Sequence, residues 1–479
     1  MPSGEREKQL LKAEHLVELH SAELKKELRL GDLVLTQILY IGGLVWFGTA
    51  GKLGSLHIMF WIPAVLLFYI PSGIVVVHLN REMPLEGGLY QWAKLRFGDM
   101  IGFLLAWNLW VYVVLILSAF VSTTADNLAY AAGPSGAWIA ESKPVTVAIG
   151  ALLMGGLMLV ALRGLALGRW IHNIGGITFV AIFAALALFA FPRWMRGSAA
   201  ISPVALSVPA VSLLNLNILA KMGFGAFYGF DAAAIFSGEC RDPHASRAIR
   251  RSVWLAAPLL VLIYILGTAF VLVFTRPSDI DLISPAMQAL SRGANEIGIG
   301  AFVAPLAGLL LICHTIGVSS INYNAVIRLP MVAGWDHLTP EWVSRLHPRF
   351  KTPVGSIVFV GLASFGFTIL GNLGVGSQEA VQLFSNGGLI CYAVAYLVMF
   401  AIPLIASGEK PSWGVRVAAA SGFLMTLLFV VLSIFPIIDV KDAAAFTAKV
   451  SGVVIGINVA GALYFWRANK RREALAPIH

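Results

Sequence analysis

The chain has 479 residues, of which 58% are hydrophobic and only 12% are charged, and its mean hydropathy is +0.81. These values exclude an ordinary soluble domain and predict an integral membrane protein. The formal net charge of +9 requires no nucleic-acid partner, because basic residues beside membrane spans face anionic lipid headgroups.

Apolar segments long enough to cross roughly 30 Å of hydrocarbon as helices recur along the whole chain. The first 31 residues are charged, and they are expected to form a soluble amphipathic arm and not a signal peptide. Twelve spans are expected after this arm, at residues 33–55, 58–79, 99–127, 145–162, 171–192, 215–237, 252–275, 299–327, 354–371, 380–407, 413–435 and 446–466.

The distribution of basic residues predicts how these spans are oriented. If the chain starts inside, the cytoplasmic segments hold 25 of the 34 Lys and Arg residues and the external segments hold 8. Lys and Arg concentrate on the cytoplasmic side of membrane proteins. Both termini are therefore predicted to be cytoplasmic, in a multi-pass protein of the plasma or inner membrane.

Glycine clusters interrupt two of the spans. The first span contains "YIGGLVWFGTAG" and the sixth contains "GFGAFYGF". Glycines at corresponding places in two halves of a transporter indicate discontinuous helices at a substrate site. Because the clusters lie five spans apart, spans 1–5 and 6–10 are predicted to form an inverted pair. The predicted units are a cytoplasmic arm (1–31), a first repeat (32–192), a second repeat (193–407), spans 11 and 12 (408–467) and a basic cytoplasmic tail (468–479).

A helix that is broken inside a membrane exposes backbone groups, each costing several kcal/mol unless it is buried in protein or lines a cavity. A ligand can compensate, since half-helix amino termini attract a carboxylate and free carbonyls attract an ammonium group or a cation. The alternative is that the glycines only allow close helix packing. Two clusters at repeat-related positions favour broken helices.

Three longer stretches resemble motifs of the amino acid–polyamine–organocation (APC) transporters, and the likeness covers most of the chain. They are "REMPLEGGLYQWAKLRFGDMIGFLLAWN", "GAFYGFDAAAIFSGECRDPHASRAIRRS" and "SSINYNAVIRLPMVAGWDHLTPEWVSRLHPRFKTPV", in the order of the family. The residues that carry the likeness are Pro84, Gly87, Gly88, Tyr90, Trp92, Phe97, Gly98, Gly102, Phe227, Gly229, Phe230, Asp231, Glu239, Pro243, Ser320, Arg328, Pro340, His347, Pro348 and Pro353.

The resemblance implies an all-α membrane protein of the LeuT type. Such a fold has 12 transmembrane helices here, with a 5+5 inverted repeat, broken helices 1 and 6, and two extra helices. It also implies alternating access and a substrate that carries both a carboxylate and an amine. The substrate-binding residues would come from the two breaks, namely Ile41, Gly42, Gly43, Leu44, Phe224, Gly225, Ala226, Phe227, Tyr228 and Gly229.

Two departures from the family pattern fall at these breaks. Leu44 stands where the first helix usually has a second glycine, so carboxylate capture by the backbone amides of residues 42–44 needs a different cradle. Gly225 stands where many members have a large aromatic gate. Either the pocket is wider at this point, or Phe224, Phe227 or Tyr228 takes the gating role.

The coupling ion is expected to be H⁺ or Na⁺. Ser319 and Ser320 match a hydroxyl pair that ligates a cation in sodium-coupled relatives, and hard cations prefer oxygen ligands. The alternative is that these hydroxyls bond a preceding carbonyl or pack at a helix interface. The lysine that proton-coupled relatives often carry in span 5 is absent, and Thr178 and Phe179 lie in the aligned region.

Three further residues are candidates for coupling or gating. Lys221 lies inside a span, where it would either let its ammonium group snorkel outward, form a structural ion pair, or act in gating. Asp231 resembles an acidic residue of proton-linked members, and burial favours the protonated form of a carboxyl. Its alternative role is a fixed partner for a hydroxyl or an amide. Asn322 is a weaker candidate.

The sequence carries no nucleophile–base pair, phosphate-binding loop or metal-ligand spacing, so no enzyme activity, cofactor or metal is expected apart from Na⁺ at Ser319 and Ser320. The predicted function is secondary transport of amino acids or related amines, as a symporter or exchanger. The alternative is a membrane amino-acid sensor of the same fold. The expected partners are the small-molecule substrate and the lipid membrane, and a monomer and a homodimer both remain open.

Overall fold

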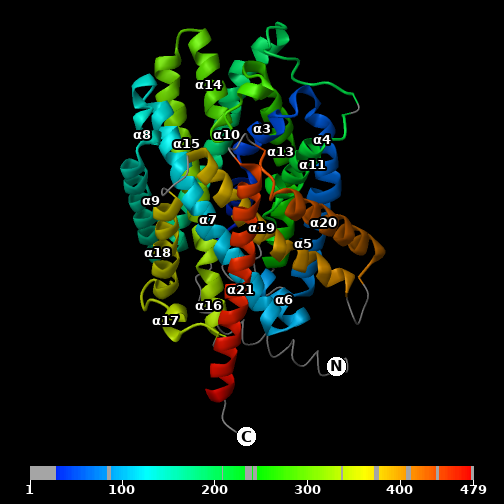
Figure 1. Cartoon of the computed structure of the whole chain (residues 1–479), viewed down its shortest axis with the longest axis vertical. Coiled ribbons are helices and arrows are strands. Elements are labelled where there is room, and N and C mark those ends of the chain that lie inside the picture. The colour runs from blue at the N-terminus through cyan, green and yellow to red at the C-terminus, as the bar shows by residue number, and fades with distance from the viewer. Residues whose placement is uncertain are drawn as a thin grey trace.

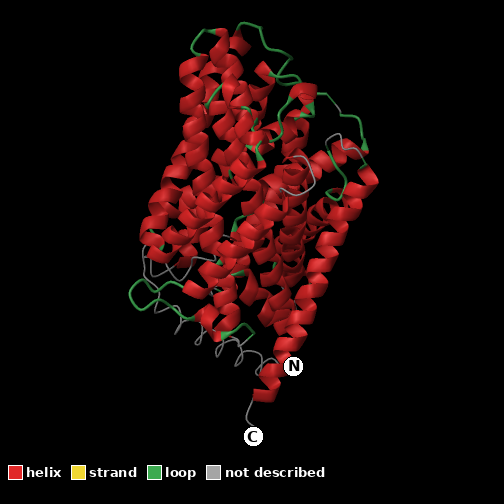
Figure 2. Ribbon diagram, turned by 60° about the vertical axis from the view of Figure 1, so that its left-hand side comes forward, coloured by secondary structure: helices red, strands yellow, loops and turns green. Residues whose placement is uncertain are grey.

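The computed structural model describes residues 28–83, 88–207, 209–231, 240, 245–335, 338–371, 377–405, 411–437 and 442–475, and these form helices without a β-sheet (Figures 1 and 2). The motif residues Pro84, Gly87, Glu239 and Pro243 lie outside this part. The helices are α2 (Leu30–Ile41), α3 (Val45–Gly51), α4 (Ile58–Ala64), α5 (Ile70–Glu82), α6 (Leu89–Phe97), α7 (Asp99–Ala131), α8 (Trp138–Glu141), α9 (Lys143–Arg163), α10 (Leu165–Met195), α11 (Leu213–Ala220), α13 (Ala245–Phe274), α14 (Pro285–Glu296), α15 (Gly300–Val326), α16 (Arg328–Trp335), α17 (Glu341–Ser344), α18 (Val354–Gly371), α19 (Ser377–Leu404), α20 (Trp413–Leu432) and α21 (Ala443–Leu475).

The helical stretches follow the predicted spans closely. Ten described stretches are long and apolar enough to cross a membrane, and the bent pair α2 and α3 makes up to eleven. The predicted sixth span, 215–237, is described only as far as Asp231. The count of twelve therefore stays a prediction, as does the division of the chain into two inverted repeats.

Glycines end several helices where the chain must change direction. Gly98, with φ 93°, separates α6 from α7, and Gly164, with φ 87°, separates α9 from α10. Residues with a Cβ atom rarely adopt this backbone conformation, so glycine stops one helix and lets the next begin at a new angle. At its other end, α9 begins with a proline in its first turn, where no intrahelical N–H partner is lost.

The first span is broken as the glycine pattern predicts. Helix α2 ends at Ile41, α3 begins at Val45, and the two helices meet at an angle of 45°. Gly42 adopts an extended conformation, with φ −67° and ψ 98°. The Gly42–Gly43 pair thus supplies the non-helical backbone that separates the two half-helices.

The sixth span breaks later than its glycine cluster indicates. Helix α11 continues into a π-helical turn over Lys221–Gly225, and helical structure persists to Phe227. The break comes at Tyr228 and Gly229, where Gly229 has a φ of 122°. Of the glycines in the cluster, only Gly229 has a backbone conformation that residues with a Cβ atom rarely adopt. Gly223 and Gly225 lie within the helical part.

Helices α7 and α19 form the centre of the bundle, and α21 runs along its outside (Figure 1). The most apolar window of α7 and that of α19 are each 72% buried, against 11% for α21. Large apolar side chains such as Leu152, Leu188 and Phe302 are more than two-thirds exposed. Such extensive apolar surface belongs in lipid. The chain is a multi-pass membrane protein.

The short helices between spans sort to opposite ends of the bundle. Helices α6, α16 and α17 lie at the end toward which the carboxyl-terminal part of α21 runs, and α8 and α14 lie at the other end (Figure 1). The first group falls in segments predicted to be cytoplasmic and the second in segments predicted to be external. This grouping agrees with the predicted alternation of the spans, while the side of the membrane on which each end lies stays a prediction.

Helices α10 and α15 approach each other closely at a pair of glycines. A Cβ atom on Gly317 of α15 would lie 2.7 Å from the Cα atom of Gly175 on α10. Small residues let backbones approach in this way in membrane proteins. Gly156 on α9 is exposed, and a Cβ atom there would meet nothing within 4 Å.

We expect Gly317→Ala to destabilise the protein by about 1–3 kcal/mol, because the new methyl group has to push two helix backbones apart. Gly156→Ala is the matched control, since it makes the same change in a helix interior at a lipid-facing position. The measurement is the melting temperature of both purified variants in detergent. Equal melting temperatures would show that the contact between α10 and α15 does not limit stability.

Candidate functional site

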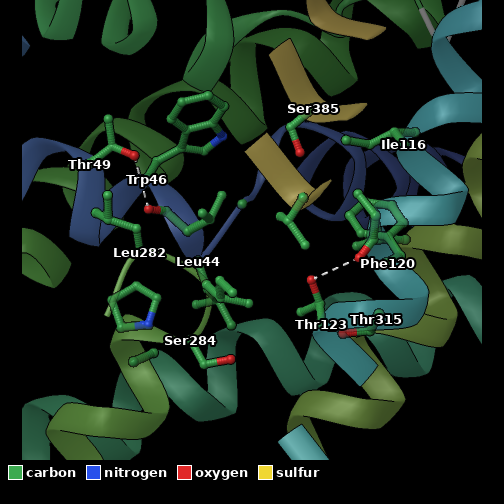
Figure 3. Close-up of a pocket in the computed structure, with 18 of the residues that line it drawn as sticks. Leu44, Trp46, Thr49, Ile116, Phe120, Thr123, Leu282, Ser284, Thr315 and Ser385 are labelled. Carbon is green, nitrogen blue, oxygen red and sulfur yellow. Dashed lines mark hydrogen bonds between the residues drawn. The ribbon is translucent and has the colours of Figure 1, made fainter. Parts of the chain in front are cut away.

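A cavity of about 160 Å³ lies beside the break in the first span. That volume far exceeds the ~10–15 Å³ that one water molecule needs. Figure 3 shows Leu44, Trp46 and Thr49 on one side of this cavity and Ile116, Phe120 and Thr123 of α7 on the other. Its further polar lining includes Asn127, Lys221, Tyr228, Ser284, His314, Thr315, Gln382, Ser385 and Asn386.

All four predicted residues of the first break, 41–44, line the cavity. Two of the three amides expected to hold a carboxylate are nevertheless engaged within the protein. The Gly42 amide donates to the carbonyl of Ile38 at 2.8 Å, and the Gly43 amide donates to the hydroxyl of Tyr264 at 2.9 Å. The expected three-amide cradle is therefore not formed in this structure.

Tyr264 of α13 connects the two breaks. Its hydroxyl accepts from the Gly43 amide and lies 2.6 Å from the carbonyl oxygen of Ile41 and 3.0 Å from that of Ala226. It is fully buried and stacks on Trp61 at a ring-centroid distance of 5.0 Å. One hydroxyl thus serves backbone groups that both interruptions leave without helical partners.

Of the sixth-span residues predicted to bind substrate, 224–229, only Tyr228 lines the cavity. Phe224 and Phe227 are fully buried in an aromatic core, where Phe224 lies 4.7 Å from Phe429 and Phe227 lies 4.3 Å from Tyr69, measured between ring centroids. Both rings are held by packing on all sides. The structure thus leaves Tyr228 as the aromatic residue of this segment that faces the cavity.

The space in front of Gly225 is filled and not open. A Cβ atom on Gly225 would collide with the indole ring of Trp46, and one on Gly229 would lie 2.5 Å from the ring of Tyr40. The expectation of a wider pocket at Gly225 is therefore wrong. Trp46, which comes from the first span, occupies the volume that an aromatic residue at position 225 would take.

Lys221 is buried inside the bundle and does not snorkel outward. The residue is 3% exposed, and its ammonium nitrogen donates to the side-chain oxygen of Asn386 at 2.8 Å. The same nitrogen lies 5.9 Å from the ring centroid of Phe429. Snorkelling fails because Lys221 lies in the π-helical turn that faces α19 and the cavity.

Asp231 is held by two tyrosines of α19. Its carboxylate accepts from Tyr392 at 2.8 and 2.9 Å and from Tyr396 at 2.5 Å. The hydroxyl of Tyr396 also accepts from the Gly229 amide at 2.9 Å, and the hydroxyl of Tyr40 lies 3.4 Å from that of Tyr392. Asp231 is therefore a partner of two hydroxyls in this structure, and its role in proton transfer stays a prediction.

The hydroxyl pair of α15 is buried, and one member is engaged. The Ser320 hydroxyl lies 3.1 Å from Nε2 of His172 and accepts from the Asn324 side chain at 3.3 Å. The Ser319 hydroxyl has no hydrogen-bond partner within the described part of the chain. Asn322 donates to the carbonyl four residues earlier at 2.9 Å. Sodium ligation by the serine pair remains a prediction.

Phe179, in the region of span 5 where the family resemblance led us to look for a lysine, packs against the first break. A Cβ atom on Gly42 would lie 2.9 Å from the Phe179 ring, which stacks on His314 at 5.3 Å between centroids. The Thr178 hydroxyl donates to the carbonyl of Gly175 in the same helix. The contact beside α2 at this point is therefore aromatic.

Five residues that organise the site were not identified from the sequence: Trp46, Tyr264, Asn386, Tyr392 and Tyr396. One signal was available for the last two. Residues four apart share a helix face, so two tyrosines at this spacing in an apolar span place both hydroxyls on one side. The other three act across long sequence separations, which no local pattern reveals.

We expect Tyr264→Phe to destabilise the protein by about 1–3 kcal/mol, because buried backbone groups at the first break lose their partner. Tyr464→Phe is the matched control, since Tyr464 is 38% exposed on α21. The melting temperatures of both variants in detergent test this. A Tyr264→Phe variant as stable as the control would mean that water or another group replaces the hydroxyl.

We expect Asp231→Asn to lower both stability and the transport that the sequence predicts, at every pH, because a neutral amide accepts more weakly from the two tyrosines than a carboxylate does. The shape of the pH profile should stay that of the parent protein. Uptake into proteoliposomes across a series of external pH values measures this. A flattened profile in the variant would instead assign proton transfer to Asp231.

Comparison with known proteins places this chain in a family. The family model described as "Amino acid permease" matches residues 32–459. An uncharacterized transporter of Legionella pneumophila is 23% identical over 398 residues, which are 81% of this chain and 82% of the relative. An arginine/ornithine antiporter of Pseudomonas aeruginosa is 24% identical over 353 residues, covering 68% of this chain and 67% of the relative.

Among solved structures, the crystal structure of MhsT in complex with L-phenylalanine aligns with a TM-score of 0.57 at 12% identity. The alignment covers 85% of this chain and 99% of that chain. It confirms the LeuT-type fold that the motifs imply. The match of the family model over most of the sequence confirms the resemblance as well, and the chain belongs to the amino acid permease family of the APC transporters.

Proposed function

We propose that the protein is a secondary active transporter that moves amino acids or related amines across a cell membrane by alternating access. The observation that carries this proposal is the cavity between the two interrupted spans, which residues 41–44 and Tyr228 line together. Substrate sites of transporters with inverted repeats lie at such interruptions. The protein would act as a symporter or an exchanger.

The comparisons support the substrate class. One relative is named as an arginine/ornithine antiporter, and the aligned structure was determined with L-phenylalanine bound. The polar lining of the cavity comes mainly from α7, α15 and α19, while the interrupted spans supply backbone and aromatic groups together with Thr49 and Lys221. A small zwitterion needs this combination of polar and apolar contacts.

The proposed arrangement in the membrane places both termini in the cytoplasm. The excess of Lys and Arg in the segments around α6, α16 and α17 supports this orientation. The proposed coupling ion is H⁺ or Na⁺, and imposing each gradient separately on the same vesicles distinguishes the two. Ser319 and Ser320 are the proposed ligands if the ion is Na⁺.

Counterflow in proteoliposomes tests the proposal without knowledge of the coupling ion. Vesicles are loaded with a mixture of unlabelled amino acids and amines, and each labelled compound is added outside in turn. We expect transient accumulation of at least one compound well above that in protein-free vesicles. Binding to the purified protein without accumulation of any compound would contradict transport.

We expect Gly225→Trp to reduce counterflow by at least about tenfold, because the new ring has to displace Trp46 into the cavity. Gly156→Trp adds the same side chain at a lipid-facing position and serves as the control. Both variants are compared after their monodispersity in detergent has been checked. Full activity with an unchanged substrate profile in Gly225→Trp would refute this steric assignment.

A further inference from the structure

We propose that Lys221 binds a carboxylate of the substrate, and that the cavity therefore selects molecules with net negative charge, such as acidic amino acids. This inference rests on the proposed transport function and specifies its substrate class. It follows from the position of the ammonium group, its hydrogen bonds and the charges around it.

The ammonium group of Lys221 is positioned to bind a ligand. Lys221 lines the cavity and is 3% exposed. An ammonium group has three N–H donors. One of them donates to Asn386 at 2.8 Å, and this is the only hydrogen bond from Lys221 within the described part of the chain. Two donors are thus left for a ligand.

The hydrogen-bonding partner of Lys221 is neutral, so its charge is not compensated. A buried charge without a counter-ion costs several kcal/mol. Within the described part of the chain, no aspartate or glutamate lines the cavity. A carboxylate bound beside Lys221 would compensate the charge of its ammonium group. An amine or a guanidinium group would be repelled at the same place.

Asp231 and Asp281, which lie close in sequence to residues that line the cavity, have partners elsewhere. Asp231 accepts from two tyrosines of α19. Asp281 accepts from the Tyr130 hydroxyl at 2.8 Å and from the backbone amides of Ile283 and Ser284. Asp281 lines a separate hollow near α8 and α14, and it is absent from the lining of the cavity. Neither residue neutralises Lys221.

The hydrogen bonds at the first break also favour Lys221 as the group that binds an anion. The amides of Gly42 and Gly43 are already bonded to Ile38 and Tyr264, so the backbone offers little to an anion. Gln382 and Asn386 lie four residues apart on α19 and both line the cavity. This face of α19 presents amide side chains to the cavity that the ammonium group lines. In a molecule with two carboxylates, one can bind the Lys221 ammonium group and the other can accept hydrogen bonds from these neutral amides.

The test compares glutamate with glutamine, which have nearly the same size and differ in charge. Counterflow of labelled L-glutamate, L-glutamine and L-arginine is measured in proteoliposomes of the parent protein. The variants are Lys221→Met, Lys221→Arg and, as the matched control, Lys143→Met on the exposed start of α9. Thermal stabilisation of each purified protein by the same three compounds provides a second measurement.

We expect the parent protein to accumulate glutamate at least about tenfold more than glutamine, and to exclude arginine. Lys221→Met should reduce glutamate counterflow by at least about tenfold and should reduce glutamine counterflow much less. Lys221→Arg should retain the preference for glutamate, and Lys143→Met should behave as the parent. If Lys221→Met does not fold, stabilisation of the parent by glutamate and not by glutamine still supports the inference.

Accumulation of glutamine or arginine without glutamate would overturn the inference and leave the proposed transport function standing. Equal glutamate counterflow in Lys221→Met and the parent would refute the role of Lys221. Absence of counterflow for every compound, including those in the wider mixture, would contradict the transport function and this inference together.

Discussion

The structure depends on one constraint, which is that a helix interrupted inside a membrane must still satisfy its backbone N–H and C=O groups. Here tyrosine hydroxyls do this at both interruptions. Tyr264 reaches Gly43, Ile41 and Ala226, and Tyr396 accepts from Gly229 while donating to Asp231. Because a hydroxyl both donates and accepts, one side chain can serve groups of either kind.

This solution changes which groups are available to a substrate. Where the protein itself satisfies the interrupted backbone, recognition of a charged group has to come from side chains. Lys221 and Asn386 lie in the same cavity, and the described lining contains no carboxylate. The conformation of the interruptions and the charge preference of the cavity are therefore linked. Tyrosines stabilise the breaks, and the ammonium group provides the electrostatic preference.

Hydrophobic length and glycine position are local signals, so they were sufficient to predict most of the membrane spans and the first break. The break at Gly42–Gly43 and up to eleven of the predicted spans follow from them. The interior of the site was less predictable. Whether Lys221 snorkels or turns inward depends on α19, which lies about 165 residues away in the sequence. The occupation of the space at Gly225 by Trp46 likewise depends on how two distant segments pack.

The position of Lys221 has a consequence for how binding could be transmitted. Its ammonium group belongs to the π-helical turn of the sixth span, and its partner Asn386 belongs to α19. With three donors, the group can keep Asn386 while it holds a carboxylate. A bound anion would then be connected to both elements at once, and its binding energy would favour the conformation in which they are close together. A ligand shifts a conformational equilibrium only through such a difference in affinity. A neutral or cationic molecule in the same cavity lacks this interaction, so charge recognition and the conformational response would arise from the same contact.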